Sequence, residues 1–170
     1  MASKNTLKVT TPNDRDIVLT RVFDAPRHLV FEAFTKPELL KRWLLGPPGW
    51  EMIECTQGNN VGDKYRYVWR HADGRQFAMH GVCREIVPPE RLVRTELMEG
   101  CPGESVVTTL LLEENAKTIM ITTARYDSRA TRDAVIKSGM EGGAAASYDR
   151  LAELVSAGST GDAKHQTGGR

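Results

Sequence analysis

The sequence predicts an α+β fold in which a curved antiparallel sheet of six or seven strands surrounds a long C-terminal helix. Residues 50–126 are a succession of apolar and alternating segments separated by short turns, which is typical of an antiparallel meander. A long segment with helical spacing of apolar residues follows, from Ser128 to about Ala157. The length of 170 residues suits a single domain.

The region before residue 50 is expected to form one strand and two short helices. Residues 1–15 have no hydrophobic period, so we expect a flexible N-terminal tail. The run DIVLTRVF at residues 16–23 predicts a strand. Pro26 stands where the first turn of a helix tolerates a missing N–H, and Pro37 starts a second short helix. Gly46-Pro47-Pro48-Gly49 cannot continue that helix.

Six strands are expected after this loop. Asp73-Gly74 marks a hairpin turn between two of them, because Asp-Gly favours the tight turns that join antiparallel strands. The six predicted strands span residues 50–57, 64–71, 76–87, 91–97, 105–113 and 117–126.

The last element is expected to be the covering helix. Ser128 is a good N-cap residue, and Gly139 predicts a break in the helical region. We expect a helix of about 15–18 residues after that break, roughly 25 Å long. The domain would then span residues 16–156, and the polar, glycine-rich residues 157–170 would form a disordered C-terminal tail.

Composition excludes several classes of partner. Lys and Arg number 23 and Asp and Glu 22, with no block of like charge, so no nucleic acid is expected. No apolar run of about 18 residues exists, so we expect no membrane span, and the polar N-terminus does not resemble a signal peptide. Three widely spaced cysteines form neither a disulfide framework nor a zinc pattern. We therefore expect a cytoplasmic protein without a metal or cofactor.

Four short motifs follow one another along the chain: VFDAP at 22–26, RW and GPPGW between 42 and 50, EIVPPERL at 85–92, and SYDRL at 147–151. Their order resembles the SRPBCC superfamily of START domains and Bet v allergens, and within it the bacterial branch named after the activator of the heat-shock protein 90 ATPase. The resemblance covers about residues 16–156 and implies a helix-grip fold, with two short helices after the first strand. Relatives in this superfamily bind lipids, hormones and polyketides, and some are cyclases or hydrolases.

A ligand cavity is predicted between the sheet and the C-terminal helix. Tyr65, Tyr67 and Trp69 alternate along one strand, and the helix carries small residues in its first half, where Ala144 and Ser147 share a face with Met140. The alternative is that the rings fill this space as ordinary core. The expected ligand-binding residues are Trp43, Tyr65, Tyr67, Trp69, Phe77, Met79, Cys83, Met140, Ala144, Ser147 and Tyr148.

No catalytic constellation is evident in the sequence. There is no Gly-rich phosphate loop ending in Lys-Ser/Thr, no His-Glu-x-x-His helix and no Gly-x-Ser-x-Gly elbow. Strand alternation places His80 outward and Glu85 inward, where Arg94 on the next strand would pair with that carboxylate. The Cys83 thiol has no activating neighbour in the sequence. We expect no catalytic residues.

The favoured function is therefore binding of a small hydrophobic or aromatic molecule, as a carrier or sensor. The alternative is a cyclase or hydrolase that acts on a polyketide-like or aromatic substrate. A co-chaperone-type interaction domain is less favoured, because the eukaryotic namesake carries a second domain for which these residues leave no room. The Gly46–Gly49 loop would either gate the cavity or pack the helix pair on the sheet, and a homodimer is possible.

Overall fold

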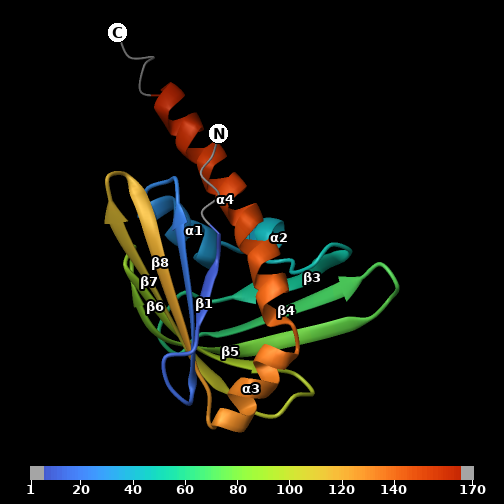
Figure 1. Cartoon of the computed structure of the whole chain (residues 1–170). Coiled ribbons are helices and arrows are strands. Elements are labelled where there is room, and N and C mark those ends of the chain that lie inside the picture. Colours follow the sequence, from blue (N-terminus) through green and yellow to red (C-terminus); the bar gives the residue numbers. More distant parts are fainter. Residues whose placement is uncertain (1–5, 166–170) are drawn as a thin grey trace.

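In a computed structural model the chain forms a curved eight-stranded antiparallel sheet around a long C-terminal helix (Figure 1). The structure describes residues 6–165, and the side chains of residues 6–157. The helix-grip prediction is therefore confirmed. The elements are β1 (Lys8–Thr10), β2 (Asp16–Phe23), α1 (Arg27–Thr35), α2 (Pro37–Trp43), β3 (Trp50–Gln57), β4 (Lys64–His71), β5 (Gln76–Val87), β6 (Arg91–Met98), β7 (Ser105–Glu114), β8 (Lys117–Arg125), α3 (Arg129–Lys137) and α4 (Met140–His165).

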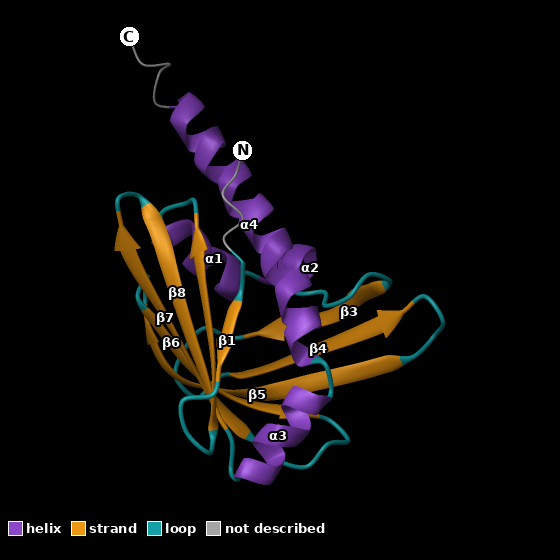
Figure 2. Cartoon of the chain, viewed as in Figure 1, coloured by secondary structure: helices purple, strands orange, loops and turns teal. Residues whose placement is uncertain are grey.

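The sheet runs in the order β1-β2-β8-β7-β6-β5-β4-β3. The strands β3 to β8 follow one another as a meander, each antiparallel to the next. The chain enters through β2, which pairs with the last strand, β8, along its whole length. This pairing brings the start of the domain next to its end, so the helices that follow β2 and those that follow β8 gather on one side of the sheet (Figure 2).

The helix α4 crosses that concave side and contacts α1, α2, α3 and β2. Its middle carries the large residues Leu151 and Val155, which are buried in one core cluster with Phe23 and Val30. Its first half carries Gly142, Gly143 and a run of alanines instead. The core is therefore dense around the middle of the helix and thinner at its start.

The predicted Asp73-Gly74 turn, the Ser128 cap and the break at Gly139 lie where the sequence placed them. Gly74 adopts φ +94° at the β4–β5 turn, a conformation that glycine accepts without strain. The Ser128 hydroxyl accepts a hydrogen bond from the Thr131 N–H at 3.1 Å and so caps α3. Gly139, at φ +83°, separates α3 from α4.

Both terminal tails are shorter in the structure than the sequence predicted. Residues 8–10 form β1, which pairs with β2, and Leu7 and Val9 pack on the core. This strand gives the sheet eight strands rather than six or seven, and it is too short to produce a readable hydrophobic period. At the other end α4 continues to His165 and has 26 residues, because a nucleated helix adds a hydrogen bond with each further residue. Residues 166–170 lie outside the described part.

None of the helices within residues 6–165 combines the length and apolar character required to cross a bilayer.

Candidate functional site

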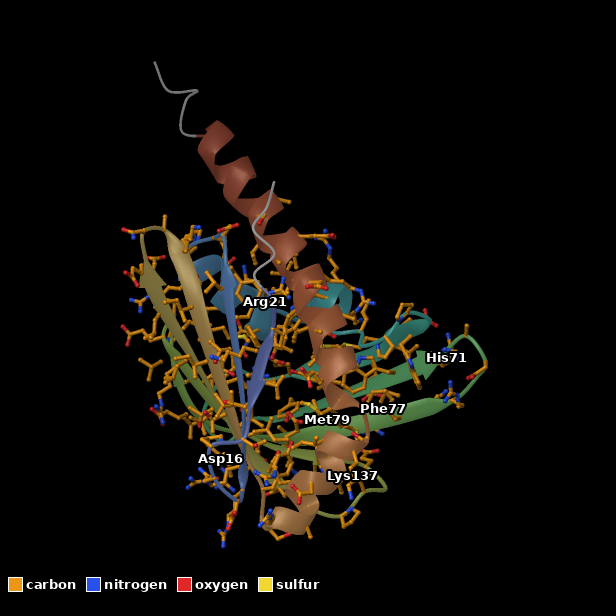
Figure 3. The ribbon with its side chains drawn as sticks, in the orientation of Figure 1. Asp16, Arg21, His71, Phe77, Met79 and Lys137 are labelled. Carbon is orange, nitrogen blue, oxygen red and sulfur yellow. The ribbon has the colours of Figure 1, made fainter. Side chains whose placement is uncertain are left out.

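A cavity of about 350 Å³ lies between the concave face of the sheet and the first half of α4. Its walls come from β2 and β4–β8, and α1, α2 and α4 complete the enclosure. Phe77 and Met98 are the exposed large apolar side chains in its lining, 36% and 38% exposed, so the opening lies beside them. In Figure 3, Phe77 and Met79 lie on the stretch of β5 next to the start of α4.

The structure brings the predicted ligand-binding residues together around this cavity, with one exception. The lining includes Trp43, Tyr65, Tyr67, Trp69, Phe77, Met79, Met140, Ala144, Ser147 and Tyr148. Cys83 does not line it. This side chain is 1% exposed in the core, and its Sγ lies 3.9 Å from the Glu85 carbonyl oxygen.

Aromatic rings form one continuous wall of the cavity. Along β4 the ring centroids of Tyr65 and Tyr67 are 5.0 Å apart, and those of Tyr67 and Trp69 are 5.8 Å apart. The Trp69 ring then stacks on Phe77 of β5 at 4.6 Å. Strand alternation produces this wall, because residues two apart point to the same face. On the opposite side Trp43 stacks on Tyr148 at 5.7 Å.

The Tyr65 ring reaches across a neighbouring strand. Tyr65 pairs with Gly81 of β5, and its hydroxyl donates a hydrogen bond to the Thr95 carbonyl of β6 at 2.6 Å. A Cβ atom at Gly81 would lie 1.9 Å from that carbonyl oxygen and 2.8 Å from the Tyr65 ring. Glycine is therefore required at this point for the ring to lie over β5.

The loop after α2 is fixed to α4 at the rim of the cavity. The Gly46 N–H donates to the Ser147 hydroxyl at 2.8 Å, and Arg150 donates to the Gly46 carbonyl at 2.7 Å. A Cβ atom at Gly143 would lie 3.4 Å from Pro47, an ordinary van der Waals distance, so the loop lies directly beside the helix at this point. The loop thus packs on α4, and a gating movement would have to break both hydrogen bonds.

Arg94 is the basic group of the cavity, and its guanidinium is held from several sides. It donates to the Tyr67 hydroxyl at 3.1 Å and to the Phe34 carbonyl at 3.2 Å. Its Cζ lies 5.3 Å from the centroid of the Tyr65 ring. The Tyr67 hydroxyl donates in turn to Gln57. Burial raises the pKa of Tyr67 to about 12, so this hydroxyl stays a neutral donor.

Glu96 is the acidic group of the cavity, and sequence reasoning missed it. It stands two residues after Arg94 on the same face of β6 and is half-buried. Among the described residues, no hydrogen bond or ion pair reaches its carboxyl group. Loss of solvent raises the pKa of Glu96 to about 7, and the nearby Arg94 charge opposes that rise.

The inward Glu85 of the sequence prediction is wrong. The pairing of β5 with β6 shifts by one residue between Cys83 and Glu85, and such a bulge reverses the faces of the residues beyond it. Glu85 therefore lies at the surface, where it pairs with Arg91 at 3.0 Å. The alternation of Leu92, Arg94 and Glu96 was the signal that could have identified the buried acid.

The remaining polar side chains of the cavity carry hydroxyl or indole N–H groups. Thr109 and Thr122 face each other across β7 and β8 with their oxygens 3.4 Å apart.

His80 points outward, as predicted, and its Nδ1 lies 3.1 Å from a Glu99 oxygen. Within the described residues, no three His, Cys, Asp or Glu side chains gather as a metal site would require. The arrangement suits an apolar molecule with a small polar group.

Comparison with known proteins gives one consistent result. The family model described as activator of Hsp90 ATPase homolog 1-like protein matches residues 24–156. A Rhodobacter sphaeroides protein of known structure is 29% identical, with a TM-score of 0.85, over 90% of this chain and 99% of that one. No curated protein matches significantly.

Two further structures show the same fold. CV1439 from Chromobacterium violaceum is 26% identical, with a TM-score of 0.74, over 84% of this chain and 98% of that one. NE0264 from Nitrosomonas europaea is 23% identical, with a TM-score of 0.77, over 86% of this chain and 97% of that one.

Proposed function

We propose that this chain, which belongs to the activator of Hsp90 ATPase homolog 1-like family, binds a small hydrophobic or aromatic molecule between its sheet and α4. The observation that carries the proposal is the cavity of about 350 Å³, walled by aromatic rings on one side and by small helix residues on the other. Pockets that bind small molecules combine such an apolar lining with a few polar groups. A carrier or a sensor would use the site in the same way.

The size of the cavity favours a ligand over imperfect packing. Apolar surface left in contact with water in an open cavity forgoes roughly 25 cal/mol per Å² of burial, so an unfilled cavity lowers stability. Larger side chains at Ala144 or Gly143 would remove much of that cost. A bound apolar molecule recovers the contacts that the empty cavity lacks.

The alternative of a cyclase or hydrolase would have to use Glu96. A carboxyl group with a pKa near 7 is suited to proton transfer at neutral pH. Among the described residues, however, the cavity lining contains no histidine and no cysteine to act with it. One acid without a partner nucleophile or base supports binding better than catalysis.

Two further proposals concern the location and the oligomeric state of the protein. A cytoplasmic location is supported by Cys55, Cys83 and Cys101, all of which are free thiols. A homodimer is compatible with the open edges of the sheet at β1 and β3.

The test is to fill the cavity from the helix. Ala144→Phe should abolish uptake of an apolar fluorescent probe and leave the free energy of unfolding unchanged or raised. Ala145→Phe is the matched control, because Ala145 is half-buried on the same helix but does not line the cavity. This control should still take up the probe.

The opposite outcome would be equally clear. In a close-packed site Ala144→Phe would lower stability by about 1–3 kcal/mol. That loss, together with a wild type that takes up no probe, would contradict the proposed function.

A further inference from the structure

Among the described residues, the cavity lining holds one charged group that has no partner. Glu96 lines the cavity, and no hydrogen bond or ion pair among the described residues reaches its carboxyl. Arg94 does not serve as its partner, because the guanidinium bonds Tyr67 and Phe34 and lies over the Tyr65 ring. A half-buried carboxyl in an apolar cavity lacks part of its hydration, so a hydrogen-bond donor on an occupant would be favourable there.

The charges around Glu96 restrict what that occupant can carry. Glu96 and Arg94 together are neutral when both are ionised, and they are the charged residues of the described lining. A cationic ligand would leave an excess positive charge in an apolar enclosure, which is unfavourable. A carboxylate ligand would face a second carboxyl and a guanidinium whose contacts are already made. A neutral donor adds no charge and supplies the missing hydrogen bond.

We infer that the ligand of this cavity carries a neutral hydrogen-bond donor, a hydroxyl or an N–H, that pairs with the Glu96 carboxylate while its apolar body lies against the aromatic wall. This inference rests on the proposed binding function. It narrows that function to hydroxylated or N–H-bearing aromatic and apolar compounds.

The tyrosines near Glu96 stay neutral around neutral pH. Burial raises the pKa of Tyr126 to about 12, and it raises those of Tyr65 and Tyr148 as well. The groups that sense the Glu96 charge are Arg94 on β6, Tyr65 and Tyr67 on β4, Tyr126 after β8 and Tyr148 on α4. A pH-dependent affinity near neutrality therefore reports Glu96.

The experiment compares four probes that share one ring system: naphthalene, 2-naphthol, 2-naphthoate and 2-naphthylmethylamine. Binding is measured for the wild type, Glu96→Gln and Glu114→Gln, the last being an exposed control outside the cavity. We expect the wild type and Glu114→Gln to bind 2-naphthol about tenfold more tightly than naphthalene, as a charge-assisted hydrogen bond allows. In Glu96→Gln this preference should fall below about threefold, with naphthalene affinity kept as evidence of an intact fold.

The pH dependence separates the competing ligand classes. Wild-type affinity for 2-naphthol should rise between about pH 5.5 and about pH 8, because the carboxylate is the better acceptor, and Glu96→Gln should show no such rise. Tightest binding of 2-naphthoate, with affinity falling as pH rises, would overturn the inference in favour of an anion. Tightest binding of the amine would overturn it in favour of a cation.

Two results distinguish this inference from the function on which it rests. If naphthalene and 2-naphthol bind equally well, the donor inference fails and the binding function stands. If no probe binds the wild type, the binding function fails as well.

Discussion

At the scale of single residues, the site depends on positions where one atom more or less decides the arrangement. Gly81 leaves β5 bare, and the Tyr65 ring uses that space to bond the Thr95 carbonyl on the far side of the strand. The same ring supports the Arg94 guanidinium at 5.3 Å. A single glycine therefore positions both an aromatic wall residue and the basic group of the cavity.

Gly81→Ala should lower the free energy of unfolding by about 2–4 kcal/mol, because the new Cβ must displace either the β6 backbone or the ring. Urea unfolding at an unchanged m value measures the loss. Gly142→Ala is the control, since a Cβ there meets nothing within 4 Å and helix propensity favours alanine by up to about 1 kcal/mol. Equal stability of Gly81→Ala and wild type would refute this account of the glycine.

Glu96 also makes stability depend on pH. Its pKa is about 7 in the folded protein and about 4.3 in an unfolded chain. Between these values the folded state binds more protons, so the Glu96 contribution to stability is lost as pH rises and stays lost above about pH 7. The loss is at most about 4 kcal/mol.

Glu96→Gln should therefore gain stability over the wild type as pH rises from about 4.5 to about 8, and the two should be closest at the acid end. Thermal unfolding of both proteins across this range gives the difference. Asp16, whose pKa is lowered chiefly by its hydrogen bond to Arg125, acts in the opposite direction but equally in both proteins. A difference that is constant with pH would show that Glu96 is not desolvated.

At the scale of elements, two stretches of α4 have different tasks. Its middle packs Leu151 and Val155 into the core, and the preceding turns hold the loop after α2 through Ser147 and Arg150. The sequence predicted this helix face, because its spacing and its small residues can be read directly. It could not predict the contact with Gly46, which joins residues 101 positions apart.

Among the strands, the alternation of side chains predicted some features and missed others. The alternation of apolar and polar side chains along residues 64–71 predicted β4 and its aromatic face correctly. The same rule failed beyond Cys83, because a β-bulge leaves no reliable signature in a single sequence. Glu85 was therefore predicted as the inward-facing carboxylate, whereas Glu96 is the one that lines the cavity. The strand β1 has three residues, too few for a period, and its pairing with β2 is a tertiary effect.

Ser147→Ala should loosen the loop without unfolding the domain. The Gly46 N–H would lose its acceptor, at a cost of about 1–2 kcal/mol, and its amide hydrogen should exchange faster. Ser138→Ala is the control, because that hydroxyl bonds the Val135 carbonyl within α3 only. Unchanged protection of Gly46 in Ser147→Ala would show that the hydrogen bond does not hold the loop.

At the scale of the whole molecule, the cavity follows from the shape of the sheet. The meander curves, α4 fills one end of the concave face, and the α1–α2 pair closes the side (Figure 1). Small residues on α4 leave the other end open to a guest. The central claim is that a small apolar molecule enters this space and no other part of the core.

The methionines provide the most direct test of that claim. Met79, Met98 and Met140 line the cavity, whereas Met52 and Met120 are buried in the core away from its lining. Titration of methyl-labelled protein with naphthalene, followed by NMR, should shift the methyl signals of the three lining methionines and leave those of Met52 and Met120 in place. Naphthalene that shifts none of the three, or shifts Met52 and Met120 as strongly, would contradict a ligand site between the sheet and α4.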